Sequence, residues 1–284
     1  MKVLVTGGNG YIGAHYCDFL NRLPVETHTM GRSNIKSTEH WQLDDVNDQN
    51  RILQVFKIVK PDRLIHLAGA PYTDSVEESR KVNAQFFSHL VRSIEMAGLT
   101  GNIRCVVFGS AAEYGPPENS GKSIKETQVC RPVNMYGKYK LEQTKEALIK
   151  SQMGHKIFVI RPFTVLGVGM PNTMIVKKII ERVKKAKRNK ESHSTIELQN
   201  PNVHRDFVDV QDVVQISWNL LSIDASFGNM INLCSGIPTS LGSIVDLLCR
   251  IYKIPSYSIS SSQEKLESPM DYHYGNNQKL LSIM

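Results

Sequence analysis

Apolar residues in the first half of the chain form an alternation of strand-like and helix-like segments. Short apolar runs of strand length occupy residues 2–6, 26–30, 64–68, 105–108 and 156–161. Between them, apolar residues recur at helical spacing in residues 11–22, 49–59, 79–97 and 136–151. Continuous apolar strands separated by such helices are typical of a parallel sheet that helices cover on both faces. With right-handed crossovers the sheet is doubly wound, so the pattern predicts an α/β fold.

After about residue 165 the alternation loosens. Helices are predicted at residues 173–187, 209–221 and 240–252, the last with Ser240 as its N-cap, and short strands at 194–198 and 230–233. Residues 256–267 are rich in serine and show no periodicity. We therefore expect a sheet domain at 1–165 and a smaller mixed α/β substrate region at 166–284, with some exchange of chain between the two.

A glycine-rich segment joins the first predicted strand to the first predicted helix. Residues 6–13 read Thr-Gly-Gly-Asn-Gly-Tyr-Ile-Gly, which fits Gly-x-Gly-x-x-Gly from Gly8. Glycines at this spacing allow a tight turn, a close approach to a pyrophosphate and the packing of helix on strand. The helix N-terminus adds free N–H groups and a partial positive charge. The segment predicts a Rossmann-type domain that binds a dinucleotide through Gly7, Gly10, Tyr11, Ile12 and Gly13.

In dinucleotide-binding folds an acidic residue about 20 positions after the glycines hydrogen-bonds the adenosine ribose of NAD. The second predicted strand lacks this acidic residue. Here Met30 and Gly31 are followed by Arg32 and Ser33. A guanidinium and a hydroxyl suit the 2′-phosphate of NADP. NADP(H) is therefore the preferred cofactor and NAD(H) the alternative, while Arg32 as an ordinary surface residue is the other interpretation.

Tyr136 and Lys140 lie four residues apart on a predicted helix and so share one face of it. A phenol ordinarily has a pKa near 10, too high for ready proton exchange at neutral pH. A neighbouring ammonium favours the phenolate, so we expect Lys140 to lower the pKa of Tyr136 and to make it an efficient acid or base.

Ser110 directly follows a predicted strand, where side chains of a parallel sheet face the ligand crevice. Its hydroxyl is placed to donate to the substrate oxygen that Tyr136 protonates. No base accompanies it as in a hydrolase triad, so nucleophilic catalysis is disfavoured. The nine histidines are scattered without metal-ligand spacing, and no metal site is predicted.

Together these motifs resemble the extended short-chain dehydrogenase/reductase family of nucleotide-sugar epimerases, dehydratases and reductases. The resemblance covers nearly the whole chain. It depends on residues 7–13, Asp45-Val46, Leu67-Ala68-Gly69, Asn83, Ser110 with Tyr114-Gly115, Tyr136 with Lys140, Arg161-Pro162-Phe163 and residues 204–212.

The resemblance implies roles for individual residues. Tyr136 would be the acid or base, Lys140 would also hold the nicotinamide ribose, and Arg205 would bind the diphosphate of the sugar nucleotide. Ala111 and Thr164 would lie with Ser110 at the sugar. The remaining cofactor contacts would come from Asp45, Val46, Leu67, Ala68, Gly69, Asn83, Pro162 and Phe163.

Several positions depart from family patterns. Dehydratases of the family carry an Asp-Glu pair directly after the Ser110 position, but this chain has Ala111 and Ala112 there, so 4,6-dehydration is disfavoured. The Arg32 turn is unlike that of 4-epimerases and, with residues 109–115, is similar to 4-keto-6-deoxy-sugar reductases. Thr164 replaces a usual asparagine and Ser268 a usual arginine. The sequence ends at Met284, so we expect a short C-terminal lid and a looser hold on the diphosphate.

Composition adds limits on partners and compartment. The chain has 284 residues, 41% hydrophobic and 21% charged, which is ordinary for a folded protein. Its net charge of +7 is concentrated in residues 177–190, which contain eight basic residues and one acidic residue. A solvated basic helix explains this stretch best, with a phosphate-attracting rim or a nucleic-acid or membrane patch as alternatives. Five widely spaced cysteines and no apolar run of membrane-spanning length favour a cytoplasmic protein.

The leading hypothesis is an NADP(H)-dependent reductase that acts on the C4 keto group of a nucleotide-diphosphate 4-keto-6-deoxy sugar. No nucleic-acid or membrane partner is expected, and the family resemblance implies a homodimer. An NAD-dependent 4-epimerase is the first alternative. A cofactor-binding protein without catalytic activity is a more distant one, disfavoured by the presence of Ser110, Tyr136 and Lys140 together.

Overall fold

Seven parallel strands form the central sheet, in the order β11-β6-β5-β4-β1-β2-β3. The computed structural model describes residues 1–32, 39–189, 193–261 and 270–284. From β1 the chain builds outward through β2 and β3 and then returns to build the other half, which confirms the predicted doubly wound α/β fold. The strands are β1 (Lys2–Thr6), β2 (Glu26–Gly31), β3 (Glu39–Gln42), β4 (Arg63–His66), β5 (Arg104–Phe108), β6 (Lys156–Pro162) and β11 (Met230–Leu233).

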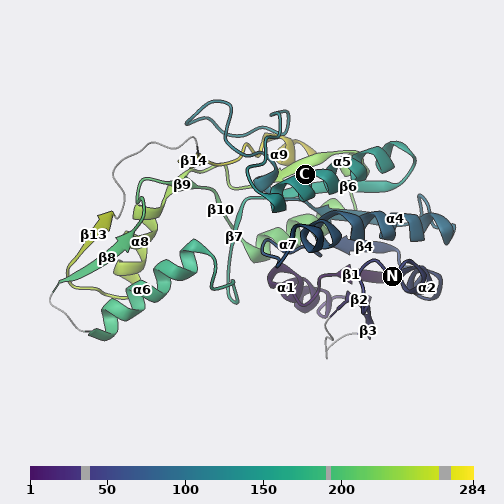
Figure 1. Ribbon diagram of the computed structural model, residues 1–284, viewed down its shortest axis with the longest axis horizontal. Coiled ribbons are helices and arrows are strands. Elements are labelled where there is room, and N and C mark those ends of the chain that lie inside the picture. Colours follow the sequence, from purple (N-terminus) through teal and green to yellow (C-terminus); the bar gives the residue numbers. More distant parts are fainter. Residues whose placement is uncertain (33–38, 190–192, 262–269) are drawn as a thin grey trace.

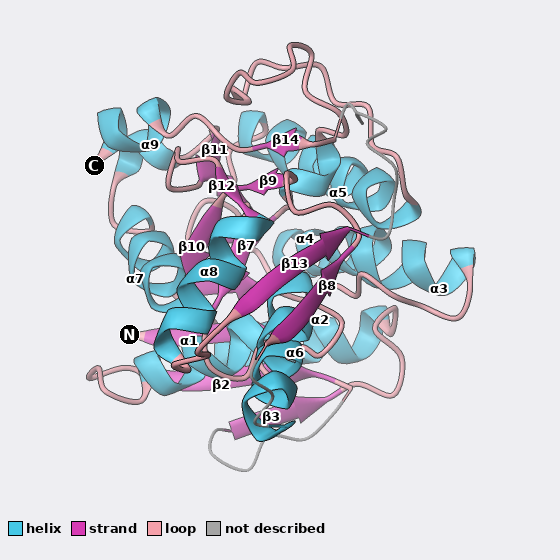
Figure 2. Ribbon diagram, turned by 90° about the vertical axis from the view of Figure 1, so that its left-hand side faces the viewer, coloured by secondary structure: helices cyan, strands magenta, loops and turns pink. Residues whose placement is uncertain are grey.

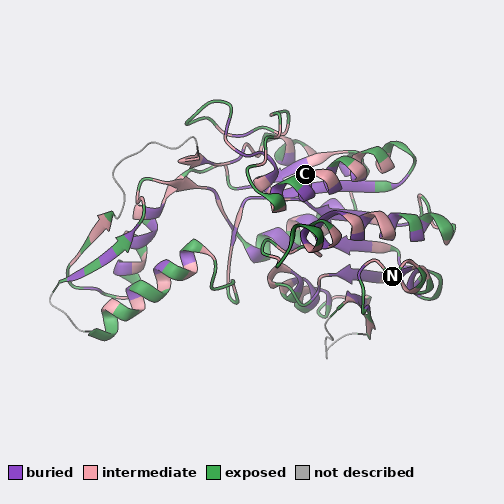
Figure 3. Cartoon of the chain, in the orientation of Figure 1, coloured by how far each residue is buried: buried purple, intermediate pink, exposed green. Residues whose placement is uncertain are grey.

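Helices cover both faces of this sheet (Figure 1), and Figure 3 shows the buried strands between them. Alternate residues of a strand point to opposite faces. Leu4 of β1 accordingly belongs to a core cluster with residues of α2 (Gln49–Val59), α4 (Phe86–Met96) and α5 (Met135–Gln152). Its neighbours Val3 and Val5 belong to the cluster on the other face, with residues of α1 (Tyr11–Leu20), α7 (Val210–Leu220) and α9 (Gln278–Ile283).

The single helix predicted over residues 79–97 is divided in the structure. It consists of α3 (Val76–Arg80), a π-helical turn at Lys81–Gln85 and α4. The side-chain amide of Asn83 donates to the backbone carbonyls of Ser79 and Ala70. An asparagine side chain that donates to a main-chain carbonyl competes with the hydrogen bonds of the helix itself. A wider, π-helical turn is common where a helix is interrupted in this way.

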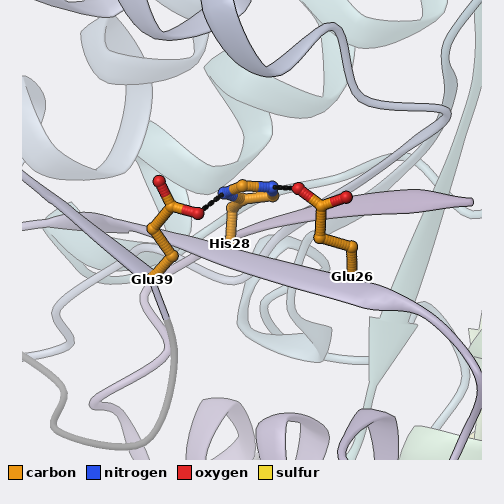
Figure 4. Close-up of side chains that lie close together, drawn as sticks. All are labelled: Glu26, His28 and Glu39. Atoms are coloured by element: carbon orange, nitrogen blue, oxygen red, sulfur yellow. Dashed lines mark hydrogen bonds and ion pairs between the residues drawn. The ribbon is translucent and has the colours of Figure 1, made fainter.

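β3 was not predicted, because the sequence Glu-His-Trp-Gln contains no apolar run. It is an edge strand, and polar cross-strand contacts hold its register. His28 of β2 lies opposite Glu39 of β3, and its two ring nitrogens contact Glu26 at 2.8 Å and Glu39 at 3.3 Å (Figure 4). Since the carboxylates lie at opposite sides of the imidazole, the group ties two strands together and does not converge on one point.

A smaller lobe projects from the sheet domain (Figures 1 and 2). It contains α6 (Ile175–Asn189), α8 (Leu241–Ile251), β8 (Ser194–Leu198) and β13 (Tyr257–Ser261), around a core that includes Val183, Ile196 and Val245. The predicted basic helix is amphipathic, with its lysines and arginines largely in solvent. Although residues 256–267 show no periodicity in the sequence, Tyr257–Ser261 forms a strand that pairs with β8 at a half-exposed edge that tolerates serine. The rest of that segment, 262–267, lies outside the described residues.

Short strand pairs connect the two lobes. β7 (Thr164–Leu166) pairs with β10 (Phe207–Asp209), and β9 (His204–Arg205) lies between β12 (Thr239–Ser240) and β14 (Tyr272–His273). Elements of two or three residues carry no periodicity, so the sequence did not predict them. The chain returns to the large sheet with α7 and β11, and Ser240 caps α8 as predicted. Within the described part of the chain, no helix combines the length and apolar character needed to cross a membrane.

Candidate active site

Two adjoining cavities lie along the carboxyl edge of the sheet. The smaller, of about 180 Å³, is lined by the glycine loop, by Arg32 and by Val46. The larger, of about 500 Å³, contains Ser110, Tyr136 and Lys140. Both cavities border Gly7, Gly10, Leu67 and Gly69, so they are continuous around the glycine loop. This is the crevice where doubly wound folds bind dinucleotides.

The glycine loop has the backbone geometry that its sequence predicts. Gly7 has a φ of 74°, and a Cβ atom on Gly13 would lie 2.1 Å from the Gly7 carbonyl oxygen. Gly10 is the N-cap of α1 and makes no side-chain hydrogen bond to that helix. The loop therefore offers close backbone approach beside a helix N-terminus, which fits a pyrophosphate. Ala68 of the predicted set lines the smaller cavity, and Tyr11, Ile12 and Gly13 line the larger.

Arg32 borders the smaller cavity, but its guanidinium is paired. Its Nη1 atom lies 2.8 Å from the Glu78 carboxylate of α3. This partner was not predictable from the local sequence, since Glu78 is 46 residues away. Ser33, the second predicted donor, lies outside the described residues. The Glu78 carboxylate would repel the 2′-phosphate of NADP but could accept a hydrogen bond from the free ribose hydroxyl of NAD. The Arg32–Glu78 pair therefore affects the choice between NADP and NAD.

Two predicted cofactor residues have other partners in the structure. Asp45 accepts a hydrogen bond from Lys81 at 2.8 Å and is not among the residues that line the smaller cavity. Asn83 is buried, and its carbonyl oxygen accepts from the Ala70 amide at 2.8 Å. Asn83 therefore stabilises the loop after β4 through Ala70. Direct contacts of Asp45 and Asn83 with the cofactor stay predictions.

Ser110 and Tyr136 both line the larger cavity, with the Ser110 side chain within interaction range of the Tyr136 phenol. Ser110 follows β5 and Tyr136 lies in the first turn of α5, whose N-cap is Asn134. Burial raises the pKa of Tyr136 to about 12, although the Ser110 hydrogen bond acts in the opposite direction. The expectation that Lys140 lowers this pKa was wrong for this structure. Tyr136 keeps its proton at neutral pH and is equipped to act as an acid.

Lys140 is buried one helical turn beyond Tyr136. Its Nζ atom donates to the carbonyl oxygens of Phe108 at 2.9 Å and Ala68 at 3.2 Å, and to the Gln143 side chain at 3.1 Å. These acceptors direct the ammonium toward the strand ends rather than toward the phenol. Burial lowers the pKa of Lys140 to about 8.

A buried ion pair supports the Ser110 loop. Glu113 accepts from the Ser110 amide at 2.7 Å and from Arg161 of β6 at 2.6 and 2.8 Å. The two side chains are 0% and 1% exposed. The sequence analysis did not single out Glu113, although Ser-x-x-Glu is a capping-box pattern that would have indicated its contact with Ser110.

A third cavity, of about 230 Å³, adjoins Ser110 on the side of the smaller lobe. It brings together four predicted residues, Ser110, Ala111, Thr164 and Arg205, with Pro162 and Phe163 between this cavity and the larger one. Arg205 is held by the Met270 carbonyl oxygen at 2.8 Å. The predicted Ser268 lies outside the described residues. No carboxylate is among the described residues that line this cavity or the larger one.

The fold and this crevice define a dinucleotide-binding oxidoreductase of the α/β class, and comparisons with known proteins give the family. Residues 3–234 match the model of the NAD dependent epimerase/dehydratase family. The chain therefore belongs to that family, whose members are NAD(P)-dependent enzymes acting on nucleotide sugars.

Individual relatives are similar over most of their length. The chain is 30% identical to GDP-6-deoxy-D-talose 4-dehydrogenase of Aggregatibacter actinomycetemcomitans, over 100% of this chain and 91% of the relative. It is 25% identical to GDP-6-deoxy-D-mannose reductase of Pseudomonas aeruginosa, over 89% and 81% of the two chains. The structure of RMD from Pseudomonas aeruginosa complexed with NADPH has the same fold, with a TM-score of 0.82, 21% identity and coverage of 100% and 92%.

Proposed function

We propose that this protein is an NADP(H)-dependent reductase of a nucleotide-diphosphate 4-keto-6-deoxy sugar. The observation that carries the proposal is the pairing of Ser110 with Tyr136 in the larger cavity, together with the place of Ser110 at the border of the cavity that contains Arg205. A carbonyl placed at this junction lies beside an acid on one side and the space for a nicotinamide on the other. The relatives named above, a 4-dehydrogenase and a reductase of GDP-6-deoxy sugars, support the same assignment.

A bound NADPH supplies the hydride that forms the new C–H bond at C4. Tyr136 gives its phenolic proton to the carbonyl oxygen, so that the ketone becomes a secondary alcohol. The Ser110 hydroxyl hydrogen-bonds the same oxygen, and Lys140, whose ammonium is held at the strand ends by the Phe108 and Ala68 carbonyl oxygens, would hold the nicotinamide ribose. Pro162 and Phe163, which line the larger cavity, would border the nicotinamide ring.

The lining of the two cavities argues against dehydration. Dehydratases of the family carry a carboxylate pair at the sugar ring, and no carboxylate is present among the described residues that line the two cavities. The nearest acidic residue to Ser110 in the sequence, Glu113, is fully buried and paired with Arg161. Its carboxylate is engaged with the Ser110 amide and cannot reach substrate without breaking the ion pair.

The experiment that tests the proposal mixes purified protein with NADPH and a 4-keto-6-deoxy sugar nucleotide and follows the nicotinamide absorbance. A reductase consumes NADPH in step with the ketone. The Arg32–Glu78 pair keeps an NAD-dependent 4-epimerase as a second candidate, because a carboxylate there suits an unphosphorylated ribose. Protein that purifies with bound NAD⁺ and interconverts 4-epimers without consuming added cofactor would contradict the reductase.

Arg32 and Glu78 should control cofactor preference in opposite directions. Arg32→Ala is expected to lower the ratio of kcat/KM for NADPH to that for NADH by about tenfold, since a charged hydrogen bond to the 2′-phosphate is lost. Glu78→Gln should raise the same ratio several-fold, because it removes a competing carboxylate at the surface. Steady-state rates with both cofactors check this, and an unchanged ratio in Arg32→Ala would remove Arg32 from cofactor recognition.

The Lys140 pKa of about 8 predicts a loss of reduction rate at alkaline pH. As pH rises through this value the ammonium becomes a neutral amine and a weaker donor to the nicotinamide ribose that it would hold, so kcat/KM for NADPH should fall by about tenfold between roughly pH 7 and pH 10. A pH profile of kcat/KM for NADPH, with far-UV circular dichroism as a control for folding, measures the effect. A flat profile over this range would show that the charge on Lys140 does not contribute.

A further inference from the structure

His273 lies beside Arg205 in the third cavity, although nothing in its sequence context indicated a role. The two residues are directly paired in the register of β14 and β9. Paired residues on adjacent strands project to the same face of a sheet. His273 and Arg205 therefore lie side by side in the cavity that Ser110 also lines.

The imidazole of His273 is buried and incompletely satisfied. Its exposed fraction is 8%, and Phe163 packs against it with ring centroids 5.6 Å apart. Among the residues that the structure describes, Nε2 has no hydrogen-bond partner. A buried polar atom without a partner is destabilising, so a ligand that supplies the missing hydrogen bond gains affinity.

The charge state of His273 indicates what kind of ligand group it meets. Burial and the neighbouring Arg205 charge lower its pKa to about 4, so the ring is neutral at physiological pH. A neutral imidazole has one donor and one acceptor nitrogen, which suits an uncharged hydroxyl. Arg205 remains the cation of this cavity and the better partner for a diphosphate.

We propose that His273 binds a hydroxyl group of the hexose ring and thereby helps to determine which nucleotide sugars the enzyme accepts. This inference rests on the proposed function, since it takes the sugar to occupy the cavity between Ser110 and Arg205. The part of the ligand next to Ser110 is the reacting ring, and His273 contacts the side of that ring that faces the smaller lobe.

Titration calorimetry in the presence of NADP⁺ tests the proposal with two ligands, GDP-6-deoxy-D-mannose and GDP. His273→Phe should weaken binding of the sugar nucleotide about tenfold, the effect of one lost hydrogen bond, and leave the affinity for GDP unchanged. His273→Gln, which keeps a donor and an acceptor, should recover part of the loss. His193→Phe, at an exposed histidine of the smaller lobe, is the matched control and should bind both ligands like the wild type.

Kinetics provide a second readout. In reduction of the 4-keto sugar nucleotide, His273→Phe should raise the KM for the sugar about tenfold, with kcat and the KM for NADPH within about twofold of wild type. Equal affinities of wild type and variant for the sugar nucleotide, or equal losses for the sugar nucleotide and GDP, would overturn the role of His273. If the wild type binds neither ligand and reduces no keto sugar, the proposed function itself fails.

Discussion

Replacing Tyr136 by phenylalanine is expected to lower kcat for keto-sugar reduction by about 10²–10⁴-fold, the usual contribution of a positioned general acid. The variant loses only the phenolic hydroxyl, which lies in the larger cavity with Ser110. The glycine loop itself is unchanged, so the Kd for NADPH should stay within about twofold of wild type. Single-turnover kinetics and a cofactor titration measure the two quantities.

Tyr139→Phe is the matched control for this prediction. Tyr139 lies on the same helix and is buried, but it is not among the residues that line the cavities. Its variant should reduce the keto sugar at close to the wild-type rate. Near-normal turnover in Tyr136→Phe would remove the phenol from the reaction and leave the mechanism without its acid.

Replacing Arg161 by methionine should lower the free energy of unfolding by about 3–5 kcal/mol, because the change leaves Glu113 as an unpaired buried charge. Glu113 and Arg161 are 0% and 1% exposed and contact each other through two guanidinium nitrogens. Since Glu113 also accepts from the Ser110 amide, the variant should lose activity together with stability. Urea unfolding followed by circular dichroism gives the free-energy difference.

The double variant Glu113→Gln/Arg161→Met separates the buried charge from the lost packing. Replacing the carboxylate by an amide removes the unpaired charge, so the double variant should recover a substantial part of the stability lost in the single one. If Arg161→Met alone unfolds at the wild-type urea midpoint, the ion pair does not stabilise the fold. If the double variant is less stable than the single one, unpaired charge is not the cause of the loss.

The fold was predictable wherever burial imposes a pattern on the sequence. Strands such as β1 are buried on both faces and therefore read as continuous apolar runs, while α2 presents one apolar stripe and begins and ends where its spacing predicts. β3 and β13 lie at edges, where polar side chains are allowed and periodicity is lost. The division of the 79–97 helix depends on the Asn83 amide, whose partner at Ala70 belongs to another segment.

The residues of the candidate site were predictable where they belong to a short sequence motif. The glycine loop, Tyr136 with Lys140, and Ser110 after a strand are each defined within a few residues, and the structure brings them to one edge of the sheet. Long-range pairings were not predictable. Glu78 reaches Arg32 and β14 places His273 beside Arg205 only through the tertiary fold. The electrostatics of Tyr136 were misjudged because sequence spacing shows neither its burial nor the carbonyl oxygens that hold Lys140.

Transfer of deuterium from NADPH labelled at C4 of its nicotinamide tests the central claim most directly. Protein, 4-keto-6-deoxy sugar nucleotide and each of the two stereospecifically labelled cofactors are incubated, and the sugar is examined by mass spectrometry and NMR. One of the two labels should appear as a single deuterium at C4 of the product, with one NADPH oxidised per sugar reduced. Sugar that is converted without label at C4 and without loss of NADPH would contradict the account.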